Sequence, residues 1–347
     1  MVRSRSQILI LLSVLCVFLG AYSLFIRRSH RAAEIARLER EYLDWDWNDT
    51  PEEIACQRPV VDNAGTQDPI PGVVHFILLA EHGKEAELEF YQYLAIKAAL
   101  VRIQPEDVKV HTYALNKNNA WWQLLDRWVT LVVHKPRETL TTADGHIHNL
   151  RLPHQTDILR LEILDREGGI YLDTDVYALQ RFDELLYSPK DILMGHEGGS
   201  RSGLGNAVMI ARPRSAFIAR WLAEYERSFD NRPQMWNHHS VIVPAQLAAD
   251  YPHEICKLSP SAFFWPHWSR EHIKSMHDPV PAGETDMAEL RRNMSLYDGA
   301  MYENQLAYHA WGNLARDQFL RPLSPESLVA VDSRFNILLR EIYQVDV

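Results

Sequence analysis

The sequence predicts an α/β fold with a mainly parallel sheet, and three observations lead to this prediction. Short apolar runs alternate with helical patterns through the middle of the chain. The first run, at 73–79, is apolar at almost every position, as expected of a strand buried on both faces of a sheet. The glycine pair Gly168 and Gly169 separates a helical pattern from the apolar run that follows it. Strands that alternate with helices in this way favour parallel pairing.

Each expected element follows from its local pattern. Runs of strand length and composition occur at 73–79, 108–113, 130–134, 170–172, 192–195 and 207–211. Helical spacing of apolar residues occurs at 85–101, 119–127 and 154–167. Residues 27–47 have the pattern of a charged helix, and 48–71, with its several prolines, predicts irregular structure.

The N-terminal segment predicts a membrane anchor. Residues 7–26 carry no charge, and at about 1.5 Å per residue a helix of that length crosses the ~30 Å hydrocarbon core of a bilayer. A cleaved signal peptide is the alternative, because Ala21-Tyr22-Ser23 resembles a cleavage site, but the apolar run continues beyond it. We therefore expect a cytoplasmic tail at 1–6, a single-span signal anchor at 7–26, a stem at 27–69 and a folded luminal domain at 70–347.

Charge and cysteine content narrow the classes of function. The net charge is −10, with 46 acidic against 36 basic residues. This argues against a nucleic-acid partner, because such binding depends on a basic surface. An anionic substrate would be repelled at long range, so a site for one needs a metal or a placed arginine. Of the three cysteines, Cys16 lies in the apolar N-terminal run, so Cys56 and Cys256 either pair or remain two buried thiols.

The helical pattern at 154–167 places charged side chains on its inward face. At about 100° per residue, Asp157 and Arg160 share one arc with Leu161 and Leu164. Buried charges are costly unless they are paired or bind a ligand. A structural ion pair across one helical turn is therefore one interpretation of Asp157 and Arg160, and a functional site is the other.

Two acidic residues follow the strand that comes after the glycine pair. The glycines stop the helix in a left-handed conformation, and the strand at 170–172 brings Asp173 to its carboxyl end, where open α/β sheets bind ligands. Side chains alternate along an extended strand, so Asp173 and Asp175 are expected to point to one side. Two converging carboxylates suit a hard divalent cation, Mg²⁺ or Mn²⁺. The alternative is a pair of solvated turn aspartates.

The segment 154–177 contains, in this order, a helical pattern, the glycine pair, a strand and the acid pair. It resembles the family-32 glycosyltransferases with a DXD sugar-binding region. Fungal Golgi mannosyltransferases and inositol-phosphoceramide sugar transferases are of this type. The resemblance implies a GT-A-type nucleotide-binding domain, Mn²⁺ or Mg²⁺, and retention of the anomeric configuration. It implies a UDP- or GDP-hexose donor and a glycan, glycolipid or glycoprotein acceptor. With the expected anchor, it implies a single-pass Golgi membrane protein with a luminal catalytic domain at 70–347, the endoplasmic reticulum being less favoured.

The resemblance also assigns roles to residues within the motif. Asp175 would bind the metal directly, and Asp173 would bridge toward metal-bound water, the ribose or the sugar. Asp157 and Arg160 would contact the sugar and phosphate groups of the donor. Asp173, Asp175 and Arg160 are thus the expected catalytic residues, with Arg160 near the charge that builds on the departing diphosphate. No carboxylate nucleophile stands out in the sequence, so the leaving group is expected to lead the displacement.

Three residues outside the motif match the family less closely. His75, in the first strand, would border the nucleotide base in the donor site, although Leu78 and Leu79 stand where many members carry tryptophan. Asn206, in a loop at 203–207, would reach the donor sugar. His309 would bind the metal or the diphosphate, or else be an exposed loop histidine.

Further residues and two other functions stay open. His238 and His239 would lie on the acceptor side, and the aromatic run 263–268 would pack in the core or stack on sugar. A phosphohydrolase with an aspartate nucleophile also places two acids after a strand, but it usually carries Thr or Val where this chain has Tyr177. A catalytically silent, membrane-tethered carbohydrate-binding protein is the other alternative, and it would show no metal-dependent donor binding.

Overall fold

The structure is a computed structural model that describes residues 49–58, 68–201, 203–229, 237–280 and 285–346. The tail expected at 1–6, the anchor at 7–26 and most of the stem at 27–69 lie outside these residues and remain predictions. Among the described helices, none combines the length and apolar character needed to cross a membrane.

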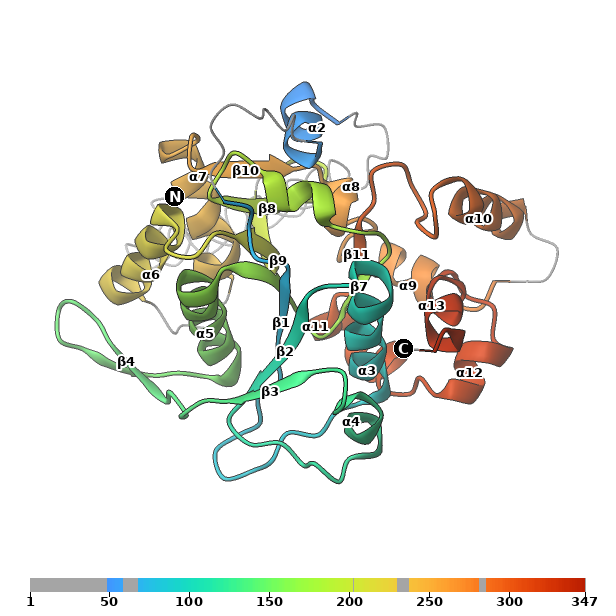
Figure 1. Cartoon of the computed structure of the whole chain (residues 1–347), viewed down its shortest axis with the longest axis horizontal. Helices are drawn as coiled ribbons and strands as arrows, with labels where there is room; N and C mark the ends of the chain where they lie inside the picture. Colours follow the sequence, from blue (N-terminus) through green and yellow to red (C-terminus); the bar gives the residue numbers. More distant parts are fainter. Residues whose placement is uncertain (1–48, 59–67, 202, 230–236, 281–284, 347) are drawn as a thin grey trace, which may run out of the picture. The chain divides into compact units, whose positions relative to one another are not determined.

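Seven strands form one sheet, in the order β10-β8-β9-β6-β1-β2-β3 (Figure 1). Strand β1 pairs in parallel with β2 and β6, β2 with β3, and β8 with β10, whereas β9 is antiparallel to both β6 and β8. The prediction of an α/β fold with a mainly parallel sheet is therefore confirmed. The strands are β1 (Val73–Ile77), β2 (Asp107–Thr112), β3 (Thr130–Val133), β6 (Gly169–Leu172), β8 (Ile192–Glu197), β9 (Gly203–Ala211) and β10 (Ile255–Leu258).

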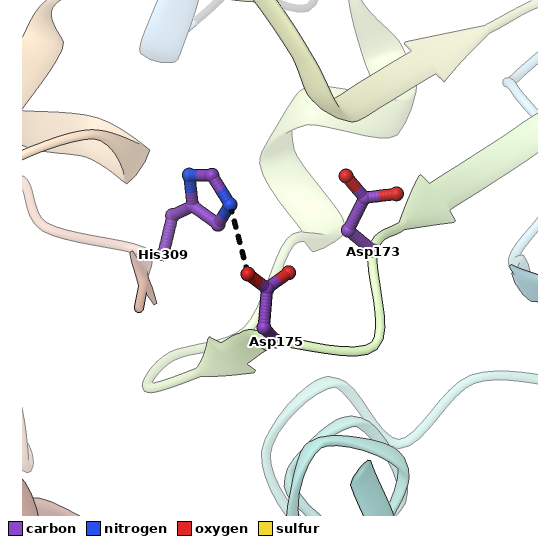
Figure 2. A group of neighbouring side chains, drawn as sticks. All are labelled: Asp173, Asp175 and His309. Atoms are coloured by element: carbon purple, nitrogen blue, oxygen red, sulfur yellow. Dashed lines mark ion pairs between the residues drawn. The ribbon is translucent and has the colours of Figure 1, made fainter. Parts of the chain in front are cut away.

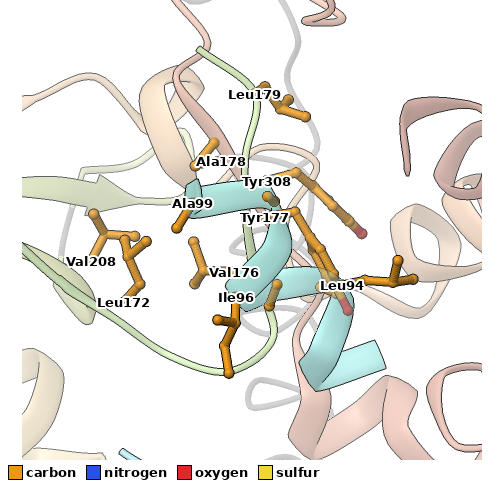
Figure 3. Close-up of a cluster of buried hydrophobic side chains, with 14 of the residues drawn as sticks. Leu94, Ile96, Ala99, Leu172, Val176, Tyr177, Ala178, Leu179, Val208 and Tyr308 are labelled. Carbon is orange, nitrogen blue, oxygen red and sulfur yellow. The ribbon is translucent and has the colours of Figure 1, made fainter. Parts of the chain in front are cut away.

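Helices cover both faces of this sheet (Figure 1). Helices α5 (Leu152–Glu167), α6 (Ala216–Ser228) and α7 (Val243–Asp250) pack on one face, and α3 (Phe90–Ala98) and α13 (Arg334–Gln344) pack on the other. Side chains of β6 alternate between the two layers. Leu172 joins the α3 side, where Figure 3 shows it near Val208, and Tyr171 joins the α5 side. This burial on both faces explains why the central strands β1 and β6 are apolar at nearly every position.

Shorter elements connect and flank these layers. Strands β7 (Val176–Ala178) and β11 (Ala307–His309) form an antiparallel ribbon, and β4 (Thr139–Thr141) pairs with β5 (Ile147–Asn149). The remaining helices are α2 (Pro51–Gln57), α4 (Ala120–Leu125), α8 (Pro260–Phe263), α9 (Arg270–His277), α10 (Thr285–Leu296), α11 (Gly312–Ala315) and α12 (Pro325–Ala330). Single π-helical or 3₁₀ turns are η1 (Ala99–Ile103), η2 (Asp183–Tyr187), η4 (His238–Ile242) and η5 (Arg316–Leu320).

The glycine pair places β6 directly after α5. Gly168 has the positive φ expected of a helix stop, 66°, but its ψ of −160° is extended, so the chain leaves α5 straight into β6. A Cβ atom on Gly168 would lie 2.6 Å from Pro213, and one on Gly169 would lie 2.6 Å from the carbonyl oxygen of Val73. Side chains larger than hydrogen would therefore force neighbouring strands apart at this edge of the sheet.

The prediction of a loop at 203–207 is wrong, because these residues belong to β9. The glycines in this stretch suggest a loop, but they allow close packing instead. A Cβ atom on Gly205 would lie 2.5 Å from Phe264, and one on Gly203 would lie 2.5 Å from Val241. Asn206 is thus held on a strand between β6 and β8.

The two cysteines Cys56 and Cys256 form a disulfide and are not free thiols. Cys56 in α2 and Cys256 in β10 are bonded, with their Cα atoms 5.5 Å apart. Helix α2 is held at a second point by an ion pair between Glu53 and Arg201, at 2.6 Å. These two contacts fix the described part of the expected stem, 49–58, against the sheet.

Candidate active site

The acid pair lies on a turn that joins β6 to β7. Asp173 follows β6 directly, and the turn is closed by a hydrogen bond of 3.0 Å from the N–H of Val176 to the carbonyl oxygen of Asp173. The sequence predicted that the two residues would follow each other along an extended strand, but they lie on a turn instead. Their carboxylates nevertheless face the same space, as Figure 2 shows. The turn achieves the convergence that strand alternation was expected to provide.

His309 completes a group of three potential metal ligands. It lies in β11, opposite Val176 of β7, and the antiparallel pairing brings its ring beside the acid pair. One donor atom from each of Asp173, Asp175 and His309 lies within 4.8 Å of the others (Figure 2). His309 Nε2 is 3.3 Å from Asp175 Oδ2, and its side chain is only 12% exposed. The alternative of an exposed loop histidine is therefore wrong.

The surroundings of Asp175 prepare it for a cation. The N–H of Gly312 donates to Asp175 Oδ2 at 2.6 Å, and the N–H of Ala310 donates to the carbonyl oxygen of Asp175 at 2.9 Å. The Nδ1 atom of His309 is buried and has no hydrogen-bond partner among the described residues. Two carboxylates and one imidazole so placed fit Mn²⁺ or Mg²⁺, which favour carboxylate oxygen.

Electrostatics separate the two acids. Burial raises the pKa of Asp173 above its ordinary value. The negative charge of Asp175 acts in the same direction, whereas Arg160 opposes it. Burial also acts to raise the pKa of Asp175, but His309 and the N–H of Gly312 outweigh it, so this pKa lies below its ordinary value. Burial acts to lower the pKa of His309, yet Asp175 raises it overall. Negative charge is thus concentrated on Asp175, the residue expected to bind the metal.

Arg160 links the acid pair to Asp157. It is 5% exposed, and its guanidinium lies 3.1 Å from Asp173 Oδ1 and 3.3 Å from Asp157 Oδ1. The guanidinium also donates to the carbonyl oxygen of Asn206 at 2.8 Å and lies over the ring of Tyr171 at 4.5 Å. The ion pair of Asp157 and Arg160 is therefore real, and it is also part of the site. These contacts give Arg160 a positioning role, because its charge is already shared by two carboxylates.

Asn206 and Tyr171 complete this network. Asn206 donates from Nδ2 to Asp157 Oδ1 at 2.8 Å, and the hydroxyl of Tyr171 donates to Asp173 Oδ1 at 2.5 Å. The structure thus brings together Asp157, Arg160, Asp173 and Asn206, as the sequence predicted. Tyr171 was not predicted, although strand alternation from Asp173 places it on the same face.

His75 lies apart from this group, contrary to the expected donor contact. It is fully buried. Its Nε2 lies 3.0 Å from the carbonyl oxygen of Gly168, and its Nδ1 lies 3.0 Å from His111 Nε2. Both ring nitrogens of His75 are thus paired within the sheet, so neither is free to contact a sugar-nucleotide donor.

Glu197 is a candidate residue that the sequence analysis missed. It ends β8, which runs in the same direction as β6, so it lies at the same edge of the sheet as Asp173. It is half-buried, and burial raises the pKa of Glu197 against the opposing effects of His309 and a hydrogen bond from Trp268. An acid placed just after the apolar run 192–195 was the available signal.

The remaining predicted residues separate into buried and partly accessible groups. Phe263, Phe264 and Trp265 are almost fully buried, which confirms core packing for this part of the aromatic run, whereas Trp268 is half-buried. His238 is half-buried and His239 is buried. The acceptor-side position expected for these histidines stays a prediction.

Known proteins resemble this chain in sequence and more weakly in structure. A family described as "Glycosyltransferase sugar-binding region containing DXD motif" matches residues 89–191. "Glucan organizing enzyme 1" of Cryptococcus neoformans var. grubii serotype A (strain H99) is 36% identical over 281 residues, which cover 78% of this chain and 70% of that protein.

Two solved structures show weaker similarity. The apo-form glycosyltransferase GlyE of Streptococcus pneumoniae TIGR4 gives a TM-score of 0.45 at 11% identity, covering 80% of this chain and 61% of that chain. Mouse xyloside xylosyltransferase 1, also in its apo form, gives a TM-score of 0.41 at 12% identity, covering 71% of this chain and 99% of that chain. The family assignment therefore depends on sequence. The matched region contains Asp173 and Asp175, and the fungal relative is similar over most of both chains, so this chain belongs to the glycosyltransferases with a DXD-containing sugar-binding region.

Proposed function

We propose that this glycosyltransferase moves a hexose from a UDP- or GDP-hexose to a glycan or glycolipid acceptor, with retention and with Mn²⁺ or Mg²⁺. The observation that carries the proposal is the convergence of Asp173, Asp175 and His309 within 4.8 Å. Their position at the carboxyl edge of a mainly parallel sheet suits a GT-A-type nucleotide site. Because the chain belongs to the DXD-containing glycosyltransferases, the two alternative functions, a phosphohydrolase and a catalytically silent carbohydrate-binding protein, have no support.

A divalent cation would supply charge neutralisation for the diphosphate that leaves the sugar. Asp175 is best placed to hold it, because backbone N–H groups fix both its side chain and its main chain. Asp173 and His309 would complete the protein's share of the ligands. The protein as a whole is acidic, so this local positive charge is what would allow an anionic donor to bind.

Arg160 would orient the two acids that flank it. Its guanidinium lies 3.3 Å from Asp157 and 3.1 Å from Asp173. Arg160 is itself buried, so it supports the two carboxylates from the protein side. Asp157 and Asn206 would then present oxygen and nitrogen atoms to the hydroxyl groups of the donor sugar. Preorganised groups of this kind stabilise a transition state without having to move during the reaction.

The location is also part of the proposal. The apolar segment 7–26 would anchor the protein in the Golgi membrane, with 70–347 in the lumen. The bond between Cys56 and Cys256 supports an oxidising compartment, where disulfides form and persist. The motif's likeness to fungal Golgi mannosyltransferases and inositol-phosphoceramide sugar transferases supports a hexose donor in such a compartment.

The test is a panel of UDP- and GDP-hexoses incubated with the full chain, with and without Mn²⁺. We expect one hexose donor to be hydrolysed or used for transfer in a metal-dependent manner. Asp175→Asn, which keeps the shape of the side chain, should lower turnover by roughly 100-fold or more. Asp126→Asn, at an exposed position in the C-cap of α4, is the matched control and should keep full activity.

Two results would overturn the proposal. The first is full metal-dependent turnover by Asp175→Asn. The second is phosphate release from small phosphomonoesters without any use of sugar nucleotides, which would restore the phosphohydrolase alternative.

A further inference from the structure

A buried polar cluster lies beside Asp157 and belongs to no role assigned so far. We define it as His154 at the start of α5, Tyr225 near the end of α6 and His239 in η4. The three residues are 3%, 1% and 2% exposed, respectively. Helix α5 and the later pair α6 and η4 therefore bring polar side chains together inside the α5 layer.

The members of the cluster contact one another and a common aromatic neighbour. The ring centroids of Tyr225 and His239 are 4.8 Å apart. Phe229 lies edge-on to His154 at 5.1 Å and beside His239 at 5.5 Å. The cluster is thus packed tightly by apolar rings, which gives its polar atoms defined positions.

Four polar atoms of this cluster lack hydrogen-bond partners among the described residues: Tyr225 Oη, both ring nitrogens of His239, and His154 Nδ1. His239 lies near the backbone of Ser228 but makes no hydrogen bond of ordinary geometry with it. Buried polar groups in folded proteins are nearly always paired, because an unpaired one costs free energy. Four such atoms in one place indicate a partner that is not among the described residues.

The cluster is connected to the donor site through Asp157. Asp157 Oδ1 is occupied by Asn206 at 2.8 Å and Arg160 at 3.3 Å. Asp157 Oδ2 lies on the other side, 3.9 Å from His154 Nδ1, which is too long for a hydrogen bond. A chain of polar contacts therefore runs from Asp173 through Arg160 to Asp157, and the far oxygen of Asp157 faces the unpaired Nδ1 of His154.

We propose that the cluster of His154, Tyr225 and His239 pairs with hydroxyl groups of the donor hexose held at Asp157, and so determines which hexose is accepted. This inference rests on the proposed function. A hydroxyl group both donates and accepts hydrogen bonds, as a phenol and neutral imidazoles do. Arg151 lies 3.4 Å from Nε2 of His154, whereas the unpaired atom of that ring is Nδ1. The unpaired atoms belong to a phenol and to imidazoles, which suit a neutral polyhydroxyl group better than a phosphate.

A site built to hydrogen-bond a substrate hydroxyl discriminates strongly against an analogue that lacks or misplaces it. The cluster thereby gives His239 a place on the donor side, whereas the sequence suggested the acceptor side. It also explains why unpaired polar groups persist here, since apolar residues of similar shape would fold equally well.

Tyr225→Phe tests the inference because it removes only the hydroxyl group. The readout is the ratio of kcat/KM for the preferred hexose donor to that for its epimers and deoxy analogues, together with the melting temperature. We expect this ratio to fall roughly 10- to 100-fold, while the melting temperature stays the same or rises because an unpaired hydroxyl has been removed. Tyr251→Phe, whose ring stacks on Arg220 at 4.0 Å near the other end of α6, is the control and should change neither quantity.

His239→Phe provides a second variant and should lower the same ratio. An unchanged donor ratio in both variants would overturn the inference, and so would a loss of melting temperature in Tyr225→Phe without any loss of selectivity. Failure of the wild-type protein to use any nucleotide sugar would instead overturn the proposed function itself.

Discussion

A chain of three histidines crosses the sheet and makes the stability of this protein depend on pH. His75, His111 and His134 lie on the neighbouring strands β1 and β2 and just after β3. His75 Nε2 lies 3.0 Å from the carbonyl oxygen of Gly168, His75 Nδ1 lies 3.0 Å from His111 Nε2, and His111 Nδ1 lies 2.8 Å from His134 Nε2. A carbonyl oxygen only accepts, so each Nε2 must carry the proton and each Nδ1 bonded within the chain must accept.

This arrangement favours neutral rings. Burial lowers the pKa of His75 to about 4, against the opposing effect of Glu167. Burial lowers the pKa of His111 to about 2, and the neighbouring histidines add to that effect. The other charged groups that act on these rings are Lys109 and Arg166, which lower the pKa, whereas Glu167 raises it.

The direction of the pH effect follows from these values. In the unfolded chain a histidine takes up a proton below a pKa of about 6.5, but in the folded chain His75 and His111 stay neutral. The unfolded state therefore binds more protons, and stability is lost as the pH falls below ~6.5. Each histidine contributes about 1.4 kcal/mol per pH unit. Together the two would remove on the order of 4 kcal/mol between pH 6.5 and 5, a large part of a typical folding free energy of roughly 5–15 kcal/mol.

His111→Phe tests this account because it keeps a buried ring but removes one titrating group. Denaturant unfolding between pH 5 and 6 should show a slope of unfolding free energy that is about 1.4 kcal/mol per pH unit smaller than in the wild type. His146→Phe, at a side chain that is 76% exposed, is the control and should keep the wild-type slope. An unchanged slope for His111→Phe would refute the reasoning, whatever that variant does to absolute stability.

Two further predictions concern the metal site and the disulfide. In Gly312→Ala the new Cβ atom would lie 2.7 Å from Asp175 Oδ2, so the Mn²⁺ concentration for half-maximal activity should rise roughly 10- to 100-fold; an unaltered metal titration would contradict this. Cys56→Ser removes a link across a sequence separation of 200 residues, so the free energy of unfolding should fall by roughly 2–5 kcal/mol. Reduced wild-type protein should match Cys56→Ser in denaturant unfolding, and a difference between them would show that the substitution acts in another way.

The central strands could be predicted because they are buried on both faces. Near-continuous apolar runs marked β1, β3 and β6, whereas β2 was marked by a run in which valines alternate with polar residues. The glycine pair marked the start of β6 to within one residue. Strand β9 was only half recognised, because its glycines resemble a loop and their role is to admit Phe264 and Val241 from elsewhere in the chain. Such packing partners have no local signature.

The site was predictable where its residues share one segment. Asp157, Arg160, Asp173 and Asp175 all lie within 154–177. Spacing paired the first two and the last two, and the family resemblance indicated that all four meet. His75 was misplaced because a histidine in a strand points to either face, and its pairing with His111 depends on strand register. Glu197 and Tyr225 were missed because their neighbours come from other elements.

The distance in sequence between the acid pair and His309 has a consequence for synthesis. At roughly 5–20 residues per second, Asp173 and Asp175 leave the ribosome on the order of ten seconds before β11. Until β11 pairs with β7, the acids have neither the imidazole nor the N–H of Gly312 that fixes Asp175. A nascent or clipped chain that stops short of β11 thus contains the entire family motif but lacks His309, the third potential ligand.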